Sequence, residues 1–147
     1  METGKNIISG KFYEVTVRGL FAQPNGMQKM SHESVSFLAS SFTEAEQAVL
    51  NQFGEDVEVK RISIAPYTEA LLCVEKDEPT FFYKIRVSYF DENENTGKSA
   101  KHSICYLVQS TSTNMAEKSI KEKLLPIMQC GYIISGVVQT KLSAVIK

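Results

Sequence analysis

The chain has 147 residues and a formal net charge of −1, with 43% hydrophobic and 22% charged residues. This length and composition predict a globular domain with a sizeable core and exclude a disordered chain. The small net charge produces no overall field that would attract nucleic acid or an anionic membrane. No apolar run approaches the ~20 residues that a membrane span needs, so we expect no membrane partner.

The cysteines and the opening residues indicate the cellular compartment of the protein. Cys73, Cys105 and Cys130 are odd in number and widely spaced, which favours reduced thiols over a disulfide framework. The opening residues, METGKNIISGK, lack the apolar core of a signal peptide. Together these features predict a cytoplasmic protein, made by a cell or by a virus inside one.

The chain opens with a predicted β-hairpin. FYEVTVRGLF at 12–21 alternates apolar and polar residues, as a half-buried strand does. QPNG at 23–26 follows, and Asn25-Gly26 favours a hairpin turn because both residues tolerate positive φ. SVSFLAS at 34–40 predicts the second strand.

A helix with a capping box comes next. Thr43 precedes EAEQAVLNQF, and Glu46 lies three residues after it; Ser41 with Glu44 offers an alternative register. Gly54 ends the helix. The apolar stripe of this helix comprises Ala45, Val49 and Phe53.

The third predicted strand changes phase in its middle. In VEVKRISIA at 57–65, the apolar alternation shifts at Lys60-Arg61, which predicts a β-bulge. A short apolar segment, YTEALL at 67–72, closes this half. The charged stretch VEKDEPT at 74–80 has the composition of a linker.

The second half repeats this pattern. FYKIRVSYF at 82–90 again opens with Phe-Tyr and alternates. DENENTG at 91–97 predicts a longer turn, with Gly97 at the place that corresponds to the glycine of the first turn. SICYLVQ at 103–109 predicts the second strand of this hairpin.

The repeated pattern continues to the end of the sequence. Asn114, with Glu117 three residues on, predicts a second capping box, and Pro126 ends that helix. YIISGVVQ at 132–139 predicts a third strand with a break in alternation at Ser135-Gly136. The helical stripe comprises Ala116, Ile120 and Leu124, and the closing apolar segment is KLSAVI at 141–146.

We therefore predict an α+β fold made by tandem duplication of a β-β-α-β unit. The first repeat covers 1–73, the linker 74–80 and the second repeat 81–147. Each repeat has an antiparallel hairpin and one capped helix. One helix cannot easily bury the apolar face of three strands, so we expect the two halves to pack together as one compact pseudo-symmetric domain.

Several of these segments resemble a family of uncharacterised proteins from Bacteroidota and their phages. The resemblance rests on SFTEAE at 41–46, on the G-x-x-K turn from Gly26 to Lys29, and on the layout that places FYEVTVRG and an IKR-like segment before FYKIRVSY and YLVQ. It covers residues 11–146. The first strand lacks the tryptophan and the cysteine that go with the family pattern. The resemblance implies a fold and a bacteriophage source, and hence the host cytoplasm, but no activity.

The strand at 82–90 carries the candidate site. Because strand side chains alternate, Tyr83, Ile85, Val87 and Tyr89 form the core face. The other face mixes aromatic and basic residues, as single-strand binders do when rings stack on bases and cations meet phosphates. An ordinary exposed face with cross-strand pairs explains the same pattern. The candidate nucleic-acid-binding residues are Phe82, Lys84, Arg86, Phe90, Lys98 and Lys101.

The sequence favours a binding protein over an enzyme. It contains no Gly-rich phosphate loop, no nucleophile elbow and no zinc-protease motif. His32 and His102 have no partners at metal-ligand spacing, so we expect no metal, no cofactor and no catalytic residues. The leading hypothesis is a small cytoplasmic module that binds single-stranded DNA or RNA. The alternative is a protein-interaction or assembly module that acts on a host or virion protein or associates with itself.

Overall fold

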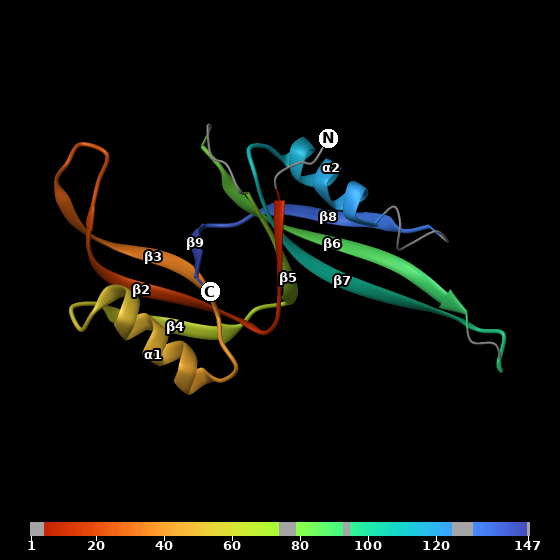
Figure 1. The fold of residues 1–147 in the computed structure, drawn as a ribbon, viewed down its shortest axis with the longest axis horizontal. Coiled ribbons are helices and arrows are strands. Elements are labelled where there is room, and N and C mark those ends of the chain that lie inside the picture. Colours follow the sequence, from red (N-terminus) through yellow and green to blue (C-terminus); the bar gives the residue numbers. More distant parts are fainter. Residues whose placement is uncertain (1–4, 74–78, 93–94, 125–130, 147) are drawn as a thin grey trace. The chain divides into compact units, whose positions relative to one another are not determined.

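The computed structural model describes residues 5–73, 79–92, 95–124 and 131–146 (Figure 1). These residues form two helices and nine strands in two sheets, so the predicted α+β class is confirmed. In chain order, the elements are β1 (Lys5–Ser9), β2 (Phe12–Ala22), β3 (Gln28–Leu38), α1 (Phe42–Phe53), β4 (Glu58–Ile64), β5 (Tyr67–Cys73), β6 (Phe81–Glu92), β7 (Ser99–Ser110), α2 (Thr113–Leu124), β8 (Ile133–Gln139) and β9 (Leu142–Ile146).

The chain divides into two compact units, and each unit is assembled from separate stretches of sequence. The α1 unit comprises residues 10–66 and 141–147, and the α2 unit comprises residues 1–9 and 67–140. The predicted repeats 1–73 and 81–147 describe a likeness within the sequence and stay a prediction. Of the predicted linker, residues 74–78 lie outside the described residues.

The α1 unit contains a four-stranded sheet in the order β4-β2-β3-β9. β2 runs antiparallel to β3 and β4, whereas β9 runs parallel to β3. Figure 1 shows α1 on one face of this sheet. The buried residues of the core between them are Val15, Val17, Val35, Phe37 and Val49.

The α2 unit contains a five-stranded sheet in the order β1-β5-β7-β6-β8. β5 runs parallel to β7, and the other neighbours are antiparallel. α2 packs on one face of this sheet, against β6, β7 and β8 (Figure 1). The buried residues of this core are Leu71, Tyr83, Ile85, Val87, Tyr106, Val108, Ala116, Ile120 and Leu124.

The two units exchange strands. β5 follows β4 along the chain but belongs to the sheet of the α2 unit, and β9 follows β8 but belongs to the sheet of the α1 unit. β5 lies parallel to β7 and β9 lies parallel to β3, an arrangement that a tight hairpin cannot produce. The short apolar segments that close the two predicted halves are therefore strands, and each completes the sheet of the other unit.

The hairpin turn at Asn25-Gly26 is confirmed, but both hairpins are longer than predicted. Gly26 has φ of 85°, and its N–H donates to the Gln23 carbonyl at 2.9 Å. Pairing continues outward to Ala22 and Gln28, so β3 starts before the predicted 34–40. β7 likewise starts before 103–109. The polar residues at these outer ends conceal the strands, since there is little apolar alternation to detect.

Both predicted bulges are confirmed. In β4, Arg61 pairs with Thr16 and Val59 pairs with Val17, so Lys60 is the extra residue. The shift has a counterpart in β8, where the partners of Arg86 and Val87 are Gly136 and Ile134, which leaves Ser135 extra. The inserted residue shifts the alternation of side chains between the two faces of the sheet by one position. As a result, Val59 and Ile62 both face α1, and Ile134 and Val137 both face α2.

The N-cap of α1 follows the alternative predicted register. The Ser41 hydroxyl accepts a hydrogen bond from the backbone N–H of Glu44 at 3.1 Å. The Glu44 carboxylate in turn accepts one from the backbone N–H of Ser40 at 3.3 Å, and another from its hydroxyl. The register of Thr43 with Glu46 is therefore wrong, because Thr43 already lies inside the first turn.

The predicted cap of α2 is also wrong. The Ser112 hydroxyl accepts a hydrogen bond from the backbone N–H of Met115 at 3.2 Å, and the N–H of Ala116 donates to the Ser112 carbonyl at 3.0 Å. Asn114 and Glu117 thus lie inside the helix. A serine in the short connection after β7 starts the helix earlier, as Ser41 does after β3.

The predicted apolar stripes and one of the helix ends are confirmed. Ala45 and Val49 are buried and Phe53 packs against the same core; Gly54 ends α1 with φ of 77°. The predicted end at Pro126 lies outside the described residues. The stripe of α2, which is fully buried, comprises Ala116, Ile120 and Leu124.

We expect Ser41→Ala to lower the free energy of unfolding by about 1 kcal/mol, because the first turn of α1 loses its cap. Thr43→Ala, the matched control, should change it by less than about 0.5 kcal/mol. Urea denaturation of both variants measures the difference. A larger loss for Thr43→Ala would contradict the observed register.

A charged cluster lies on the helix side of the α2 unit. Lys123 Nζ lies 3.4 Å from the Glu69 carboxylate and 5.1 Å from the centre of the Tyr106 ring. Burial raises the pKa of Tyr106 above its ordinary value of 10.0, and the charges of Glu69 and Tyr89 raise it further. The hydroxyl of Tyr106 therefore keeps its proton in the folded state at a pH where the unfolded chain has lost it.

This shift predicts a loss of stability in alkali. The contribution of Tyr106 is fully present below its unfolded pKa of 10.0 and is lost as the pH rises through the higher folded pKa. Tyr106→Phe removes this contribution, so its free energy of unfolding should fall less between about pH 9 and pH 11 than that of the wild type. Denaturant titrations across this range provide the measurement. Equal slopes for the two proteins would contradict the shift.

Candidate interaction surface beside strand β8

The two faces of β6 differ in burial. Tyr83, Ile85 and Val87 point toward α2 and are buried, as predicted, whereas Tyr89 is half-buried. The face of this sheet opposite α2 is called the distal face below. From β6 it carries Phe82, Lys84, Arg86, Ser88 and Phe90.

Part of the distal face is not the exposed surface that the sequence predicts. Phe82 has only 6% of its surface exposed, so its ring has almost no area to stack on a base. Lys84 is half-buried, and its Nζ lies 5.9 Å from the centre of the buried Tyr67 ring. Because its ammonium group already interacts with this ring, Lys84 is less able to bind a phosphate. Arg86 and Phe90 are exposed.

Strand pairing brings together three of the six predicted residues. Lys101 lies opposite Phe90 across β6 and β7, and both side chains are exposed. Directly paired residues project from the same face of an antiparallel sheet, so Arg86, Phe90 and Lys101 share the distal face. Lys98 is exposed but precedes β7, and its backbone N–H contacts the Thr96 hydroxyl at 3.4 Å.

Two apolar side chains of β8 also lie on this face, although neither is among the residues predicted for the site. Ile133 lies opposite Ser88 and is 61% exposed; Val138 lies opposite Lys84 and is 62% exposed. Gly136 lies opposite Arg86, so β8 places no side chain over the guanidinium. The predicted break at Ser135-Gly136 was the available signal: strict alternation would assign the two residues to opposite faces, and one extra residue between them brings both to the same face.

These neighbours define the β6–β8 patch, which consists of Arg86, Phe90, Ile133 and Val138. Phe90 is 61% exposed, like the two aliphatic residues. The patch borders the outer edge of β8, since β8 is the last strand of its sheet.

Hydroxyl groups hold the bulge at the centre of the patch. The Ser135 hydroxyl donates to the Arg86 carbonyl at 3.3 Å and lies 3.1 Å from the hydroxyl of the buried Ser88. Ser88 in turn lies 3.3 Å from the Ser103 hydroxyl on β7. The three serines link β7, β6 and β8 beneath the exposed side chains. These contacts hold the three strands that carry the patch in fixed positions.

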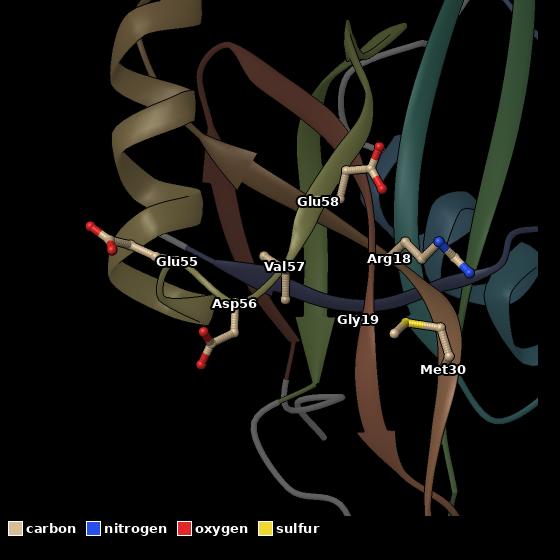
Figure 2. Close-up of a pocket in the computed structure, with 7 residues that line it drawn as sticks. All are labelled: Arg18, Gly19, Met30, Glu55, Asp56, Val57 and Glu58. Atoms are coloured by element: carbon tan, nitrogen blue, oxygen red, sulfur yellow. The ribbon is translucent and has the colours of Figure 1, made fainter.

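A shallow pocket of about 330 Å³ lies in the α1 unit. Figure 2 shows Met30 pointing toward Gly19, while the charged groups of Arg18, Glu55 and Asp56 point in different directions. Catalytic and ligand sites need polar groups that converge. This pocket therefore has no evident chemistry of its own. Its lining comprises Arg18, Gly19, Met30, Glu55, Asp56, Val57 and Glu58.

An apolar groove of about 320 Å³ lies beside that pocket, between α1 and β4. Leu50 is 48% exposed and Val59 is 44% exposed, and Glu46 is the charged residue of the lining. This α1–β4 groove borders the outer edge of β4, the last strand of its sheet. Its lining comprises Glu46, Val49, Leu50, Gly54, Val57, Val59 and Ile62.

Neither histidine belongs to a metal site among the described residues. No three His, Cys, Asp or Glu side chains in that part of the chain are grouped to hold an ion. His32 lies opposite Arg18 in the α1 unit. His102 stacks on Tyr89 at 5.3 Å and lies 3.9 Å from the Asp91 carboxylate. Within the same residues, no helix is long and apolar enough to cross a membrane.

Comparison with known proteins places the chain in a family. The model of a domain of unknown function, DUF4494, matches residues 11–147. The chain belongs to the DUF4494 family. None of the curated proteins and none of the solved structures matches it. The predicted membership of an uncharacterised family is confirmed, while the Bacteroidota and phage source of the DUF4494 chain stays a prediction.

Because Phe82 is buried and Phe90 is exposed, replacing them should lower the free energy of unfolding by different amounts. We expect Phe82→Ala to cost about 3–5 kcal/mol, as is typical for a buried ring. Phe90→Ala should cost less than about 0.5 kcal/mol, because most of its ring is exposed. Urea unfolding of both variants tests this, and equal losses would show that the distal face is buried differently.

Proposed function

We propose that the DUF4494 chain is a non-enzymatic module that binds another protein through the β6–β8 patch. The observation that carries this proposal is the exposure of three large apolar side chains around Arg86, at the edge of a sheet. Exposed apolar groups that cluster are rarer than scattered ones, and they are typical of interaction sites.

The composition of the patch favours a protein partner. Arginine and aromatic residues are enriched at the energetic centres of protein interfaces. Arg86 here lies between the levels of Val138 and Ile133, Phe90 follows further along β6, and Gly136 leaves the space beside Arg86 open. A partner could thus bury apolar area and pair with the guanidinium at the same place.

The edge of β8 adds a second means of recognition. Between Ile133 and Gln139 this strand has no charged residue, whereas protected edges usually carry lysine or proline. Its bulge remains as a partial protection. An extended segment of a partner can pair with the backbone of such an edge while its side chains contact the patch.

Binding of single-stranded nucleic acid is the second candidate. Arg86, Phe90 and Lys101 share one exposed face, which combines a ring with two cations. Against this reading, Phe82 is buried and Lys84 contacts Tyr67, so one stacking ring remains of the two predicted. This reduction favours the protein partner.

We also propose that the fold arose by tandem duplication of a β-β-α-β unit. Four strands of each sheet have matching orders, with β4, β2, β3 and β9 corresponding to β8, β6, β7 and β5. Each bulge lies opposite the same position counted from the opening Phe-Tyr of β2 and of β6. A serine after the second hairpin strand caps each helix.

The proposed source and compartment of the chain rest on its sequence. A Bacteroidota or phage source rests on the resemblance of SFTEAE at 41–46 and the two-part layout. A cytoplasmic location rests on the number and spacing of the cysteines. Under both, the partner would be a host or virion protein.

A peptide selection tests the proposed function. The wild type should select peptides from a random displayed library, and Arg86→Glu should weaken their binding more than about tenfold. Gly136→Leu should weaken it as well, since a side chain there has room and would cover Arg86. Lys118→Glu, the same type of charge reversal at an exposed position of α2, should change it less than about twofold.

The same proteins are titrated against a fluorescent single-stranded oligonucleotide at low and moderate salt. Oligonucleotide binding that falls steeply with salt, without peptide selection, would support the second candidate and reject the first. Peptides that bind all four proteins equally would show that the β6–β8 patch is not the site.

A further inference from the structure

The α1–β4 groove and its surroundings carry a local negative charge. Helix α1 contains Glu44 and Glu46 and no basic residue. Glu55 and Asp56 follow it and are exposed. Glu58 at the start of β4 is paired with Lys60 at 3.1 Å, so the remaining acidic groups outnumber the cations around the groove.

The two units do not differ as an acidic and a basic unit. Residues 1–75 are acidic and residues 76–147 are basic, but strand exchange redistributes these charges. The α1 unit, residues 10–66 and 141–147, carries seven Lys and Arg and seven Asp and Glu. Any electrostatic attraction between copies must therefore be local.

Locally, the groove and the β6–β8 patch are complementary. Each combines exposed apolar side chains with a charged group, and the charges are opposite: Glu46 beside Leu50 and Val59, and Arg86 beside Ile133 and Val138. Each also borders the outer edge of a bulged strand. Complementary charge fixes the orientation of an interface, and apolar burial supplies its affinity.

We propose that the β6–β8 patch of one copy of this chain docks on the α1–β4 groove of a second copy. The inference rests on the proposed protein-binding function and names the partner. In this arrangement Arg86 pairs with Glu46 of the second copy, and the exposed aliphatic residues of β8 cover Leu50 and Val59.

The two surfaces differ, so the contact is heterologous. Each copy that docks by its patch still offers its groove to another copy. Such a head-to-tail contact forms a ring if the rotation closes and a chain of copies if it does not. The average mass should then rise above the 16.4 kDa of one copy as the protein is concentrated.

Two single variants test the arrangement, because each disables one surface. Arg86→Glu disables the patch and Leu50→Glu disables the groove; both positions are exposed, so both variants should fold. Each variant alone should sediment as one copy. An equal mixture should form a dimer and nothing larger, because the intact patch of one variant docks on the intact groove of the other. Lys118→Glu and Gln52→Glu, exposed residues of α2 and α1, are the matched controls and should assemble like the wild type.

The outcomes separate this inference from the function on which it rests. A wild type that sediments at 16.4 kDa at every concentration would overturn self-association, and the peptide selection would still decide the proposed function. Assembly by Leu50→Glu alone, with no restoration in the mixture, would mean that patch contacts patch and would reject the groove. Circular dichroism of each variant confirms that a loss of assembly is not a loss of folding.

Discussion

The extra residue at Ser135 in β8 determines which side chains the distal face of the α2-unit sheet presents. Without it, Ile133 and Val138 would project from opposite faces, since strand side chains alternate. With it, both lie on the distal face, while Ile134 and Val137 pack toward α2. One inserted residue thus serves the core and the candidate site together.

The same device occurs in β4, where Lys60 is the extra residue and Val59 and Ile62 face α1. In both sheets the bulged strand also lies at an outer edge. A bulge at an edge limits uncontrolled pairing, and the apolar residues beside it still provide a surface for a specific partner. The placement of the β6–β8 patch and of the α1–β4 groove follows from this combination.

Strand exchange is the second constraint on this molecule. β5 and β9 each lie in the sheet opposite to the one that their preceding strand completes. Neither sheet can therefore be completed by one half of the sequence. The exchange also explains why the acidic and basic halves do not become an acidic and a basic unit. Charged residues therefore matter through the local surfaces on which they cluster and not through the net charge of a unit.

The sequence alone determined the class of fold, the hairpins, both bulges and the helical stripes, because these depend on alternation and spacing between near neighbours. It placed the α1 cap only as one of two registers, and it missed the α2 cap, since several polar residues precede each helix and only the path of the chain selects one. The burial of Phe82, the contact of Lys84 with Tyr67 and the grouping of Arg86 with Ile133 and Val138 were decided by tertiary structure. Each of these depends on strands far apart in the sequence, and residue spacing contains no information about which strands become neighbours.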